Sequence, residues 1–270
     1  MSGFLCPKPT LNGTPVVAIL AGGLATRLHP VTASIPKSMV TVAGEPFIAH
    51  QLRLLSRQGL SEIVICVGHF GDQIEAFVGD GHRFDCRVRY SRDGVHPLGT
   101  GGAIRHALPL LGAEFVALYG DSYLVAPLAP VIEAFAQSGK PGLMTVLRNR
   151  GAWDRSNVEM AGGEIVRYEK DSPTAAMEYI DYGLSLFCPE PFLNWPEGSA
   201  FELSAVQRDL VATGAMAAFE VTERFYEIGS MRGLRETGNF LRSCLVRPES
   251  RPEDATHSGA TRDFIMGTPV

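Results

Sequence analysis

The 270-residue sequence predicts an α/β fold in which a mostly parallel sheet is flanked by helices. The first observation is that short apolar runs rich in β-branched residues recur along the chain, beginning with VVAIL at 16–20. The second is that segments with helical spacing lie between these runs, which is typical of parallel sheets covered on both faces. The third is a change of pattern after Arg150, where two alternating strands surround Gly162 and Gly163. A smaller second part of the domain is therefore expected there.

Strands are expected where apolar runs are bounded by turn-forming residues. Such runs lie at 16–20, 62–68, 87–91, 114–121, 143–149 and 181–187, with a short one at 39–42, a hairpin at 157–170 and an extended stretch at 217–229. In the first expected helix, at 47–58, Ile48, Leu52 and Leu55 fall on one face and Gly59 ends the helix. Further helices are expected at 71–81, 99–111, 129–137, 203–213 and 231–244.

The chain is expected to hold one domain at residues 15–245, with its second part at about 150–230. Residues 1–14 are expected to be an N-terminal leader. Residues 246–270 are rich in Pro, Ser, Asp, Arg and Gly and contain few apolar residues, which predicts a disordered tail.

The composition argues against several classes of partner. The net charge is −5 and the pI is about 5.8, whereas nucleic-acid and membrane-surface proteins usually carry a basic excess. No apolar run approaches the roughly 20 residues of a membrane span, and no secretory signal is recognisable. The five cysteines are scattered without a CxxC pair, which predicts reduced thiols and a cytoplasmic location. Homo-oligomer formation stays open.

The loop LAGGLATRL (20–28) follows the first expected strand. Gly22 and Gly23 allow a ligand to approach the backbone closely, and free N–H groups in such a turn bind anions. The loop has neither Walker A nor GxGxxG spacing. A tight turn with a solvent-exposed Arg27 is the alternative.

Two later loops carry features of an anion site. Lys37 follows Pro36, so that its ammonium group is presented from a stiff loop ten residues after Arg27. PLGTGGA (97–103) begins a helix, and its N–H groups are expected to bind an anion or its backbone to line a base. A surface lysine and a flexible loop are the respective alternatives.

Acidic residues stand at strand ends. Asp121 follows FVALYG, and Mg²⁺ takes one or two carboxylates together with phosphate oxygens. A helix N-cap is the alternative for this residue. Glu169-Lys170, Asp181 and Glu227 lie on or beside apolar strands and together could bind a sugar and supply a second metal carboxylate. Singly, each is also compatible with a surface position.

These motifs together resemble the sugar-1-phosphate nucleotidyltransferases, or NDP-sugar pyrophosphorylases. LAGGLATRLHPVT…PKSMV is similar to that family's LAGG-x-GTRL-x-P-x-T…PK-P signature. PLGTGGA, LYGD, the EK pair, DYGLSLF and FYEIGSMRGL follow in the family's order, and the resemblance covers about residues 15–243. The LGTGGAI loop and the short length look most like mannose-1-phosphate or D-glycero-D-manno-heptose 1-phosphate guanylyltransferases. The resemblance implies a Rossmann-like, GT-A-like domain with a small sugar-binding subdomain.

The resemblance also implies a reaction and its residues. A sugar-1-phosphate oxygen attacks the α-phosphorus of a nucleoside triphosphate, and pyrophosphate leaves. Because the nucleophile is already an anion, alignment and charge neutralisation are sufficient. Arg27, Lys37 and Asp121 are the implied catalytic residues, with Mg²⁺ as cofactor. The implied nucleotide-binding residues are Leu20, Ala21, Gly22, Gly23, Thr26, Arg27, Gly99, Thr100 and Gly102. The implied sugar-phosphate ligands are Lys37, Glu169, Lys170, Asp181 and Gly183, and the implied metal ligands are Asp121 and Glu227.

Three residues depart from the family pattern. Glu227 stands where the family usually has Asp, which puts direct metal ligation in doubt. Ala25 replaces the usual glycine in G-T-R-L. Asp181 replaces a frequent Asn, and its charge favours hydrogen bonds from sugar hydroxyls but repels phosphate.

The sequence motifs favour GTP with a heptose- or mannose-1-phosphate. UTP with a hexose- or amino-sugar-1-phosphate comes next, followed by CTP with a phosphorylated alcohol. A non-catalytic nucleotide-sugar-binding protein is the remaining alternative.

Overall fold

The computed structural model describes the backbone of residues 13–23 and 32–246. Ala25, Thr26 and Arg27 lie outside the described residues, as do most of the expected leader and tail.

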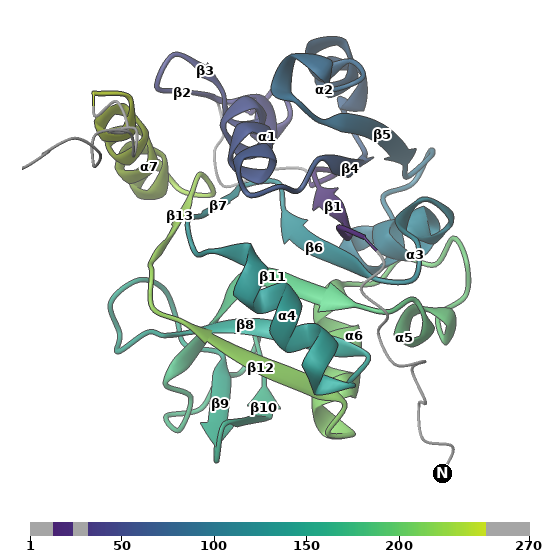
Figure 1. Ribbon diagram of the computed structural model, residues 1–270, viewed down its shortest axis with the longest axis vertical. Helices are drawn as coiled ribbons and strands as arrows, with labels where there is room; N and C mark the ends of the chain where they lie inside the picture. Colours follow the sequence, from purple (N-terminus) through teal and green to yellow (C-terminus); the bar gives the residue numbers. More distant parts are fainter. Residues whose placement is uncertain (1–12, 24–31, 247–270) are drawn as a thin grey trace, which may run out of the picture.

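Four parallel strands form one half of the main sheet (Figure 1). β1 (Val16–Leu20) lies between β4 (Glu62–Val67) and β6 (Phe115–Tyr119), and β5 (Arg87–Arg92) pairs with β4 on the outer side. The predicted parallel order is confirmed here. All four carboxyl ends lie at the same edge of the sheet, where ligands bind in folds of this kind.

An antiparallel strand joins this half to the second one. β11 (Tyr179–Phe187) pairs antiparallel with β6 and with β8 (Gly142–Arg148), and β12 (Met216–Val221) pairs parallel with β8. β9 (Val158–Ala161) and β10 (Glu164–Tyr168) form the predicted hairpin. Within the described part of the chain, these nine strands make one continuous sheet.

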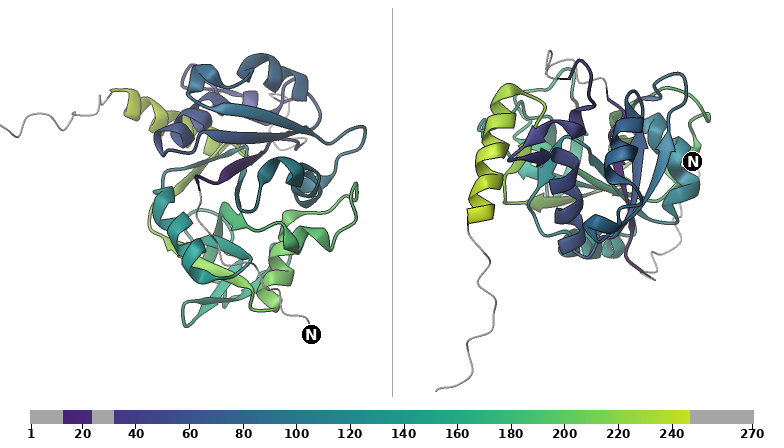
Figure 2. Two further views of the ribbon diagram at one scale, coloured as in Figure 1. Left: turned by 45° about the vertical axis from the view of Figure 1, so that its right-hand side comes forward. Right: turned by 90° about the horizontal axis from the view of Figure 1, so that it is seen from above.

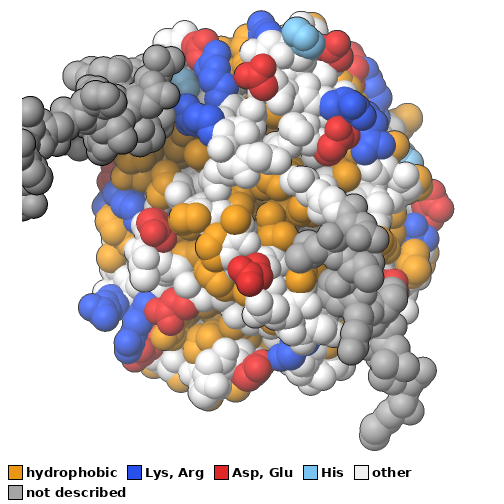
Figure 3. All heavy atoms as spheres, viewed as in Figure 1, with side chains coloured by type: hydrophobic (Ala, Val, Ile, Leu, Met, Phe, Trp, Pro, Cys, Tyr) orange, Lys and Arg blue, Asp and Glu red, His pale blue; other side chains and the backbone are white. Residues whose placement is uncertain are grey.

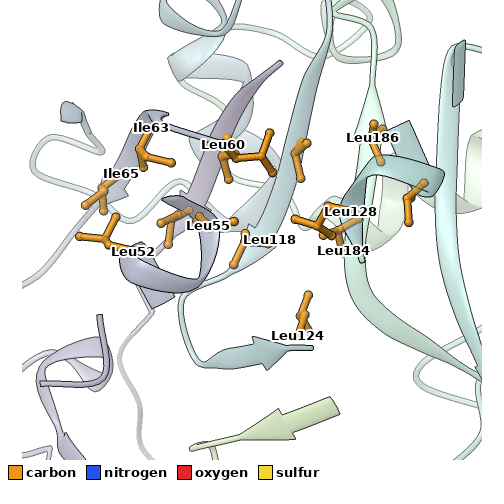
Figure 4. Packing of buried hydrophobic residues seen from close by; sticks show 14 of the residues in the cluster. Leu52, Leu55, Leu60, Ile63, Ile65, Leu118, Leu124, Leu128, Leu184 and Leu186 are labelled. Carbon is orange, nitrogen blue, oxygen red and sulfur yellow. The ribbon is translucent and has the colours of Figure 1, made fainter. Parts of the chain in front are cut away.

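Helices cover both faces of the sheet, as the alternation predicts. α1 (Phe47–Arg57), α2 (Gly71–Val78) and α4 (Leu128–Ser138) cover one face and contribute to one apolar cluster, which also includes Val17 and Ile19 of β1. Figure 4 shows this layer, with Leu52 and Leu55 of α1 beside Ile63 and Ile65 of β4. The layer holds the parallel strands together because its apolar side chains are removed from water.

The opposite face carries a second apolar layer. α3 (Gly99–Leu111), α5 (Glu190–Leu193) and α6 (Leu203–Ala212) contribute to this layer, which also includes Ala18 and Leu20, the alternate residues of β1. Both faces of β1 are therefore buried, which explains why its sequence is continuously apolar.

The C-terminal helix α7 (Met231–Val246) stands along one side of the molecule (Figure 2). It packs against two small antiparallel ladders: β2 (Thr41–Val42) with β3 (Glu45–Pro46), and β7 (Ser122–Leu124) with β13 (Phe225–Glu227). Their shared apolar cluster consists of Val40, Val42, Phe47, Tyr123, Ile228 and Leu241. This cluster fixes β13 beside the end of β6.

Two local predictions need correction. The strand expected at 39–42 begins only at Thr41, because Lys37–Met39 form a 3-10 turn after Pro36. The extended stretch expected at 217–229 is two strands in two different sheets, since the chain leaves the main sheet after Val221.

The surface drawn in Figure 3 mixes basic and acidic side chains around apolar patches, without a field of one sign. No helix within the described ranges combines the length and apolar character needed to cross a bilayer. No disulfide joins the cysteines in these ranges: Cys66, Cys86 and Cys188 are buried and Cys244 is exposed.

Candidate active site

Gly22, Gly68 and Gly120 follow the carboxyl ends of the neighbouring parallel strands β1, β4 and β6. The amide of Ala21 donates to Cys66 O and that of Gly120 donates to Leu20 O, both at 2.9 Å. A Cβ on Gly68 would lie 2.9 Å from Gly22 O, and one on Gly120 would lie 2.9 Å from Leu20 O. These glycines allow the chain segments to approach one another, and no atom of the described residues lies within 4 Å of a Cβ placed on Gly23.

A first cavity of about 370 Å³ opens at this edge. The predicted residues that line it are Leu20, Ala21, Gly22, Gly23, Lys37, Gly99, Thr100 and Asp121. Segments separated by a hundred residues therefore face one cleft, as the position of the first loop and of Asp121 at strand ends predicts. The cavity is also lined by Asp93 and Glu202, which the sequence did not single out.

The second glycine-rich loop packs on the segment before α6. The amides of Gly101 and Gly102 both donate to Phe201 O, so they are not free to bind an anion. A Cβ on Gly102 would lie 2.5 Å from Ser199 O, and Gly102 does not line the cavity. Of the predicted residues in this loop, Gly99 and Thr100 line the cleft and Gly102 does not. Thr100 Oγ1 donates a hydrogen bond to Glu202 Oε2 at 2.7 Å.

Charged groups converge beside Gly229. Lys37 Nζ lies 2.6 Å from Asp121 Oδ2. Glu227 is opposite Ser122 in the β7–β13 ladder, and its carboxylate accepts hydrogen bonds from the Gly229 amide and from Ser230 Oγ. A Cβ on Gly229 would lie 2.8 Å from Glu227 Oε2, 3.0 Å from Lys37 Nζ and 3.5 Å from Asp121 Oδ2. One ammonium and two carboxylates thus surround a residue without a side chain.

The donor set fits a magnesium ion that completes its shell with phosphate oxygens and water. Mg²⁺ in such sites usually takes only one or two protein carboxylates. Asp121 Oδ1 has only a long contact of 3.4 Å, from Ser122 Oγ, among the described residues. In the same ranges no group of three or more His, Cys, Asp or Glu side chains gathers as a closed metal site. Asp121 and Glu227 are the residues that would hold the ion.

A second cavity of about 810 Å³ lies next to the first. It is lined by the predicted residues Asp121, Lys170, Asp181, Gly183 and Glu227. Tyr119 and Asp121 line both cavities, so they mark the junction. Gly183 has a φ of +93°, which favours glycine, and its amide donates to Asp181 Oδ1 at 3.0 Å.

Lys170 and Asp181 belong to one polar network, in which the Lys170 side chain is 36% exposed and that of Asp181 3%. Lys170 Nζ lies 3.3 Å from Tyr119 OH and 3.6 Å from Asp181 Oδ2, which also accepts a 2.9 Å hydrogen bond from Tyr168 OH. Burial alone would lower the pKa of Lys170, but Tyr119 and Asp181 outweigh it and raise that pKa above its ordinary value. Burial, and then Asp181, raises the pKa of Tyr168 well above its ordinary value. The ammonium therefore stays charged and held at the junction.

The Glu169 side chain lies beside Arg208 and does not line the second cavity. Its Oε1 lies 3.7 Å from Arg208 Nη1 and accepts a hydrogen bond from the Asp171 amide at 3.1 Å. It does not line the second cavity, so the structure separates Glu169 from the other predicted sugar ligands.

One overlooked residue had a signal in the sequence. Asp93 follows β5 as Asp121 follows β6, and the same strand-end rule would have selected it. Burial raises the pKa of Asp93, although the Leu98 amide donates to its Oδ2. Glu202, Arg155 and Arg224 had no such signal, because long-range packing brings them to the cavities.

The arrangement can align two phosphorylated ligands end to end. Their phosphates would meet where Lys37, Asp121 and Lys170 lie, in a site that offers both cations and metal-binding carboxylates.

Comparison with known families agrees with this geometry. The family model described as nucleotidyl transferase matches residues 16–239. The chain is 31% identical to an N-acetylmuramate alpha-1-phosphate uridylyltransferase of Caulobacter vibrioides over 216 residues, 76% of this chain and 88% of that protein. A protein of the same name from Neisseria meningitidis is 41% identical over 104 residues, 38% of this chain and 45% of its own length.

The fold is also similar to solved structures. HddC from Yersinia pseudotuberculosis, solved with GMP-PN, superposes with a TM-score of 0.71 at 23% identity, over 84% of this chain and all of that one. At this identity the likeness shows the fold alone.

Proposed function

Because this chain belongs to the nucleotidyl transferase family, we propose that it transfers the uridylyl group of UTP to N-acetylmuramate 1-phosphate. The chain is an enzyme of the sugar-1-phosphate nucleotidyltransferase class, so the non-catalytic alternative is set aside. One observation carries the assignment of roles. The two cavities share Tyr119 and Asp121, and Lys37 lies at that junction.

In this proposal the triphosphate lies in the first cavity and the sugar phosphate in the second. An oxygen of the sugar phosphate attacks the α-phosphorus in line, and pyrophosphate leaves with the electrons of the broken P–O bond. Lys170 holds the acceptor phosphate, and Lys37 neutralises charge that builds up on the α-phosphate. Arg27 lies outside the described residues, and its contact with pyrophosphate stays a prediction.

Asp121 and Glu227 would hold Mg²⁺, which supplies charge neutralisation for the phosphates when it is bound. Because Gly229 has no side chain, the carboxylates of Asp121 and Glu227 can both lie close to Lys37, where the ion would bind.

The choice of substrates rests on the relatives rather than on the motifs. Two relatives that carry the same name act, by that name, on N-acetylmuramate 1-phosphate with a uridylyl donor. The names of these relatives favour UTP over GTP, which is the nucleotide that the LGTGGAI loop favours. GTP with mannose- or heptose-1-phosphate is the second candidate.

The test is a pyrophosphate-release assay with product identification by mass spectrometry. UTP, GTP, CTP and dTTP are each combined with N-acetylmuramate 1-phosphate, N-acetylglucosamine 1-phosphate and mannose 1-phosphate, with Mg²⁺ or EDTA. We expect Mg²⁺-dependent UDP-N-acetylmuramate as the main product. A GDP-sugar as the main product would replace the first pair by the second.

A further inference from the structure

We propose that the second cavity contains a carboxylate subsite in which Arg155 binds the acid group of the acceptor sugar. The inference rests on the proposed function, because N-acetylmuramate differs from N-acetylglucosamine by a lactyl ether that ends in a carboxylate. Arg155 lines the second cavity on the loop between β8 and β9.

A buried amide builds this loop around Arg155. Asn149 is 1% exposed, and its Nδ2 donates to Asp154 O and, at 3.0 Å, to Ser156 Oγ. Its Oδ1 accepts a hydrogen bond from the Trp153 amide at 3.1 Å. Residues on both sides of Arg155 are therefore tied to one buried side chain, which reduces the entropy that the loop loses when it binds a ligand.

Cation–π contacts of Arg224 hold the same loop through Trp153. The guanidinium carbon of Arg224 lies 3.8 Å from the Trp153 ring centre and 4.4 Å from that of Tyr226. Such contacts stabilise an arginine over aromatic faces. Arg224 Nη2 also pairs with Glu236 Oε2 at 2.7 Å. Arg224 is thus a positioning residue, which connects the loop to β13 and α7.

The charges in the cavity distinguish Arg155 from its neighbours. Lys170 is paired with Asp181, while Arg224 and Arg232 share Glu236. Arg155 is exposed and lines the cavity, and no ion pair, hydrogen bond or ring contact of its guanidinium is found within the described ranges. A free guanidinium is suited to a carboxylate, which it can bind through two parallel hydrogen bonds.

The position agrees with the shape of the proposed acceptor. The phosphate is on C1 and the lactyl group on C3, so a sugar whose phosphate lies beside Lys170 can direct its acid away from the junction. The cavity of about 810 Å³ is within the range of sites for small ligands. Arg155 and Lys170 line this same cavity, so one sugar can present its phosphate to the lysine and its acid to the arginine.

The experiment compares two acceptors in three variants. Arg155→Gln removes the charge, Arg155→Lys retains it, and Arg150→Gln is the matched control because Arg150 is in the same loop but does not line the cavity. The values of kcat/KM are measured with UTP and Mg²⁺ for N-acetylmuramate 1-phosphate and N-acetylglucosamine 1-phosphate.

We expect Arg155→Gln to lower the preference for the acidic sugar by about 10- to 100-fold, mainly through KM, with little change for the neutral sugar. Arg155→Lys should recover part of the preference, and Arg150→Gln should keep it. Equal losses for both sugars in Arg155→Gln, or no preference in the wild-type enzyme, would overturn the subsite.

Calorimetric titration of the two sugar phosphates separates this inference from the proposed function. If no UDP-sugar forms but N-acetylmuramate 1-phosphate binds more tightly in an Arg155-dependent manner, the proposed reaction fails and the subsite stands. If UDP-sugars form and binding of the two sugars is equal, the reaction stands and the subsite fails.

Discussion

Replacing Gly233 by alanine should displace the Glu227 carboxylate. Gly233 is in the first turn of α7, and a Cβ there would overlap Glu227 Oε1 and lie 2.7 Å from the Glu227 carbonyl oxygen. Ser230 Oγ caps the helix by accepting a 2.9 Å hydrogen bond from the Gly233 amide while it donates to Glu227 at 2.6 Å. The carboxylate therefore cannot keep its place beside an alanine.

The magnitude follows from two opposing terms. Alanine in place of glycine stabilises a helix by about 1 kcal/mol. Displacement of Glu227 weakens its hydrogen bonds from Gly229 and Ser230, which in this half-exposed setting contribute on the order of 1 kcal/mol each. The net change is a loss of about 1 kcal/mol, or about 2–4 °C in Tm. Because Glu227 is proposed to hold Mg²⁺, activity should fall about 10- to 100-fold.

Gly238→Ala on the same helix is the control. A Cβ on Gly238 would meet its nearest atoms at 3.6 Å, which is ordinary contact, so Tm should rise while activity is unchanged. The assays are thermal unfolding and pyrophosphate release across a Mg²⁺ titration. Wild-type Mg²⁺ dependence in Gly233→Ala would refute the role assigned to Glu227.

Three further predictions follow. Asp121→Asn should reduce activity about 1000-fold or more while circular dichroism stays native, since its charge is needed at the phosphates; a smaller loss would argue against its metal role. Gly99→Ala should raise the KM for the triphosphate, because φ is +69° and a Cβ would lie 2.6 Å from Phe201 O. Gly112→Ala, with φ of +79° but no atom of the described residues within 4 Å, should lower only Tm. Burial, and then Asp93, raises the pKa of Cys66 from 9.0 to about 12. The folded state therefore holds this proton more tightly, and the free energy of unfolding should fall as pH rises from about 9 toward 12. Denaturant titrations should show a shallower decline for Cys66→Ala, and an identical slope would contradict this cause.

Local sequence patterns are enough to predict most helices and strands and one edge of the site. The apolar runs and helical spacings are local properties, and they predict the parallel strands β1, β4, β5 and β6 and the helices between them. Leu20 and Asp121 meet at one cleft because the carboxyl ends of adjacent parallel strands lie together. Even Asp93, which was overlooked, follows the same rule.

The directions of the remaining side chains depend on tertiary packing. β11 enters antiparallel beside β6, and the β7–β13 ladder places Glu227 next to Asp121 across more than a hundred residues. Gly102 turns toward Ser199 and Glu169 toward Arg208, although both residue types suited the predicted site. Residue type and spacing report on the nearest few positions, whereas side-chain direction depends on strand register and on which distant segment fills the neighbouring space.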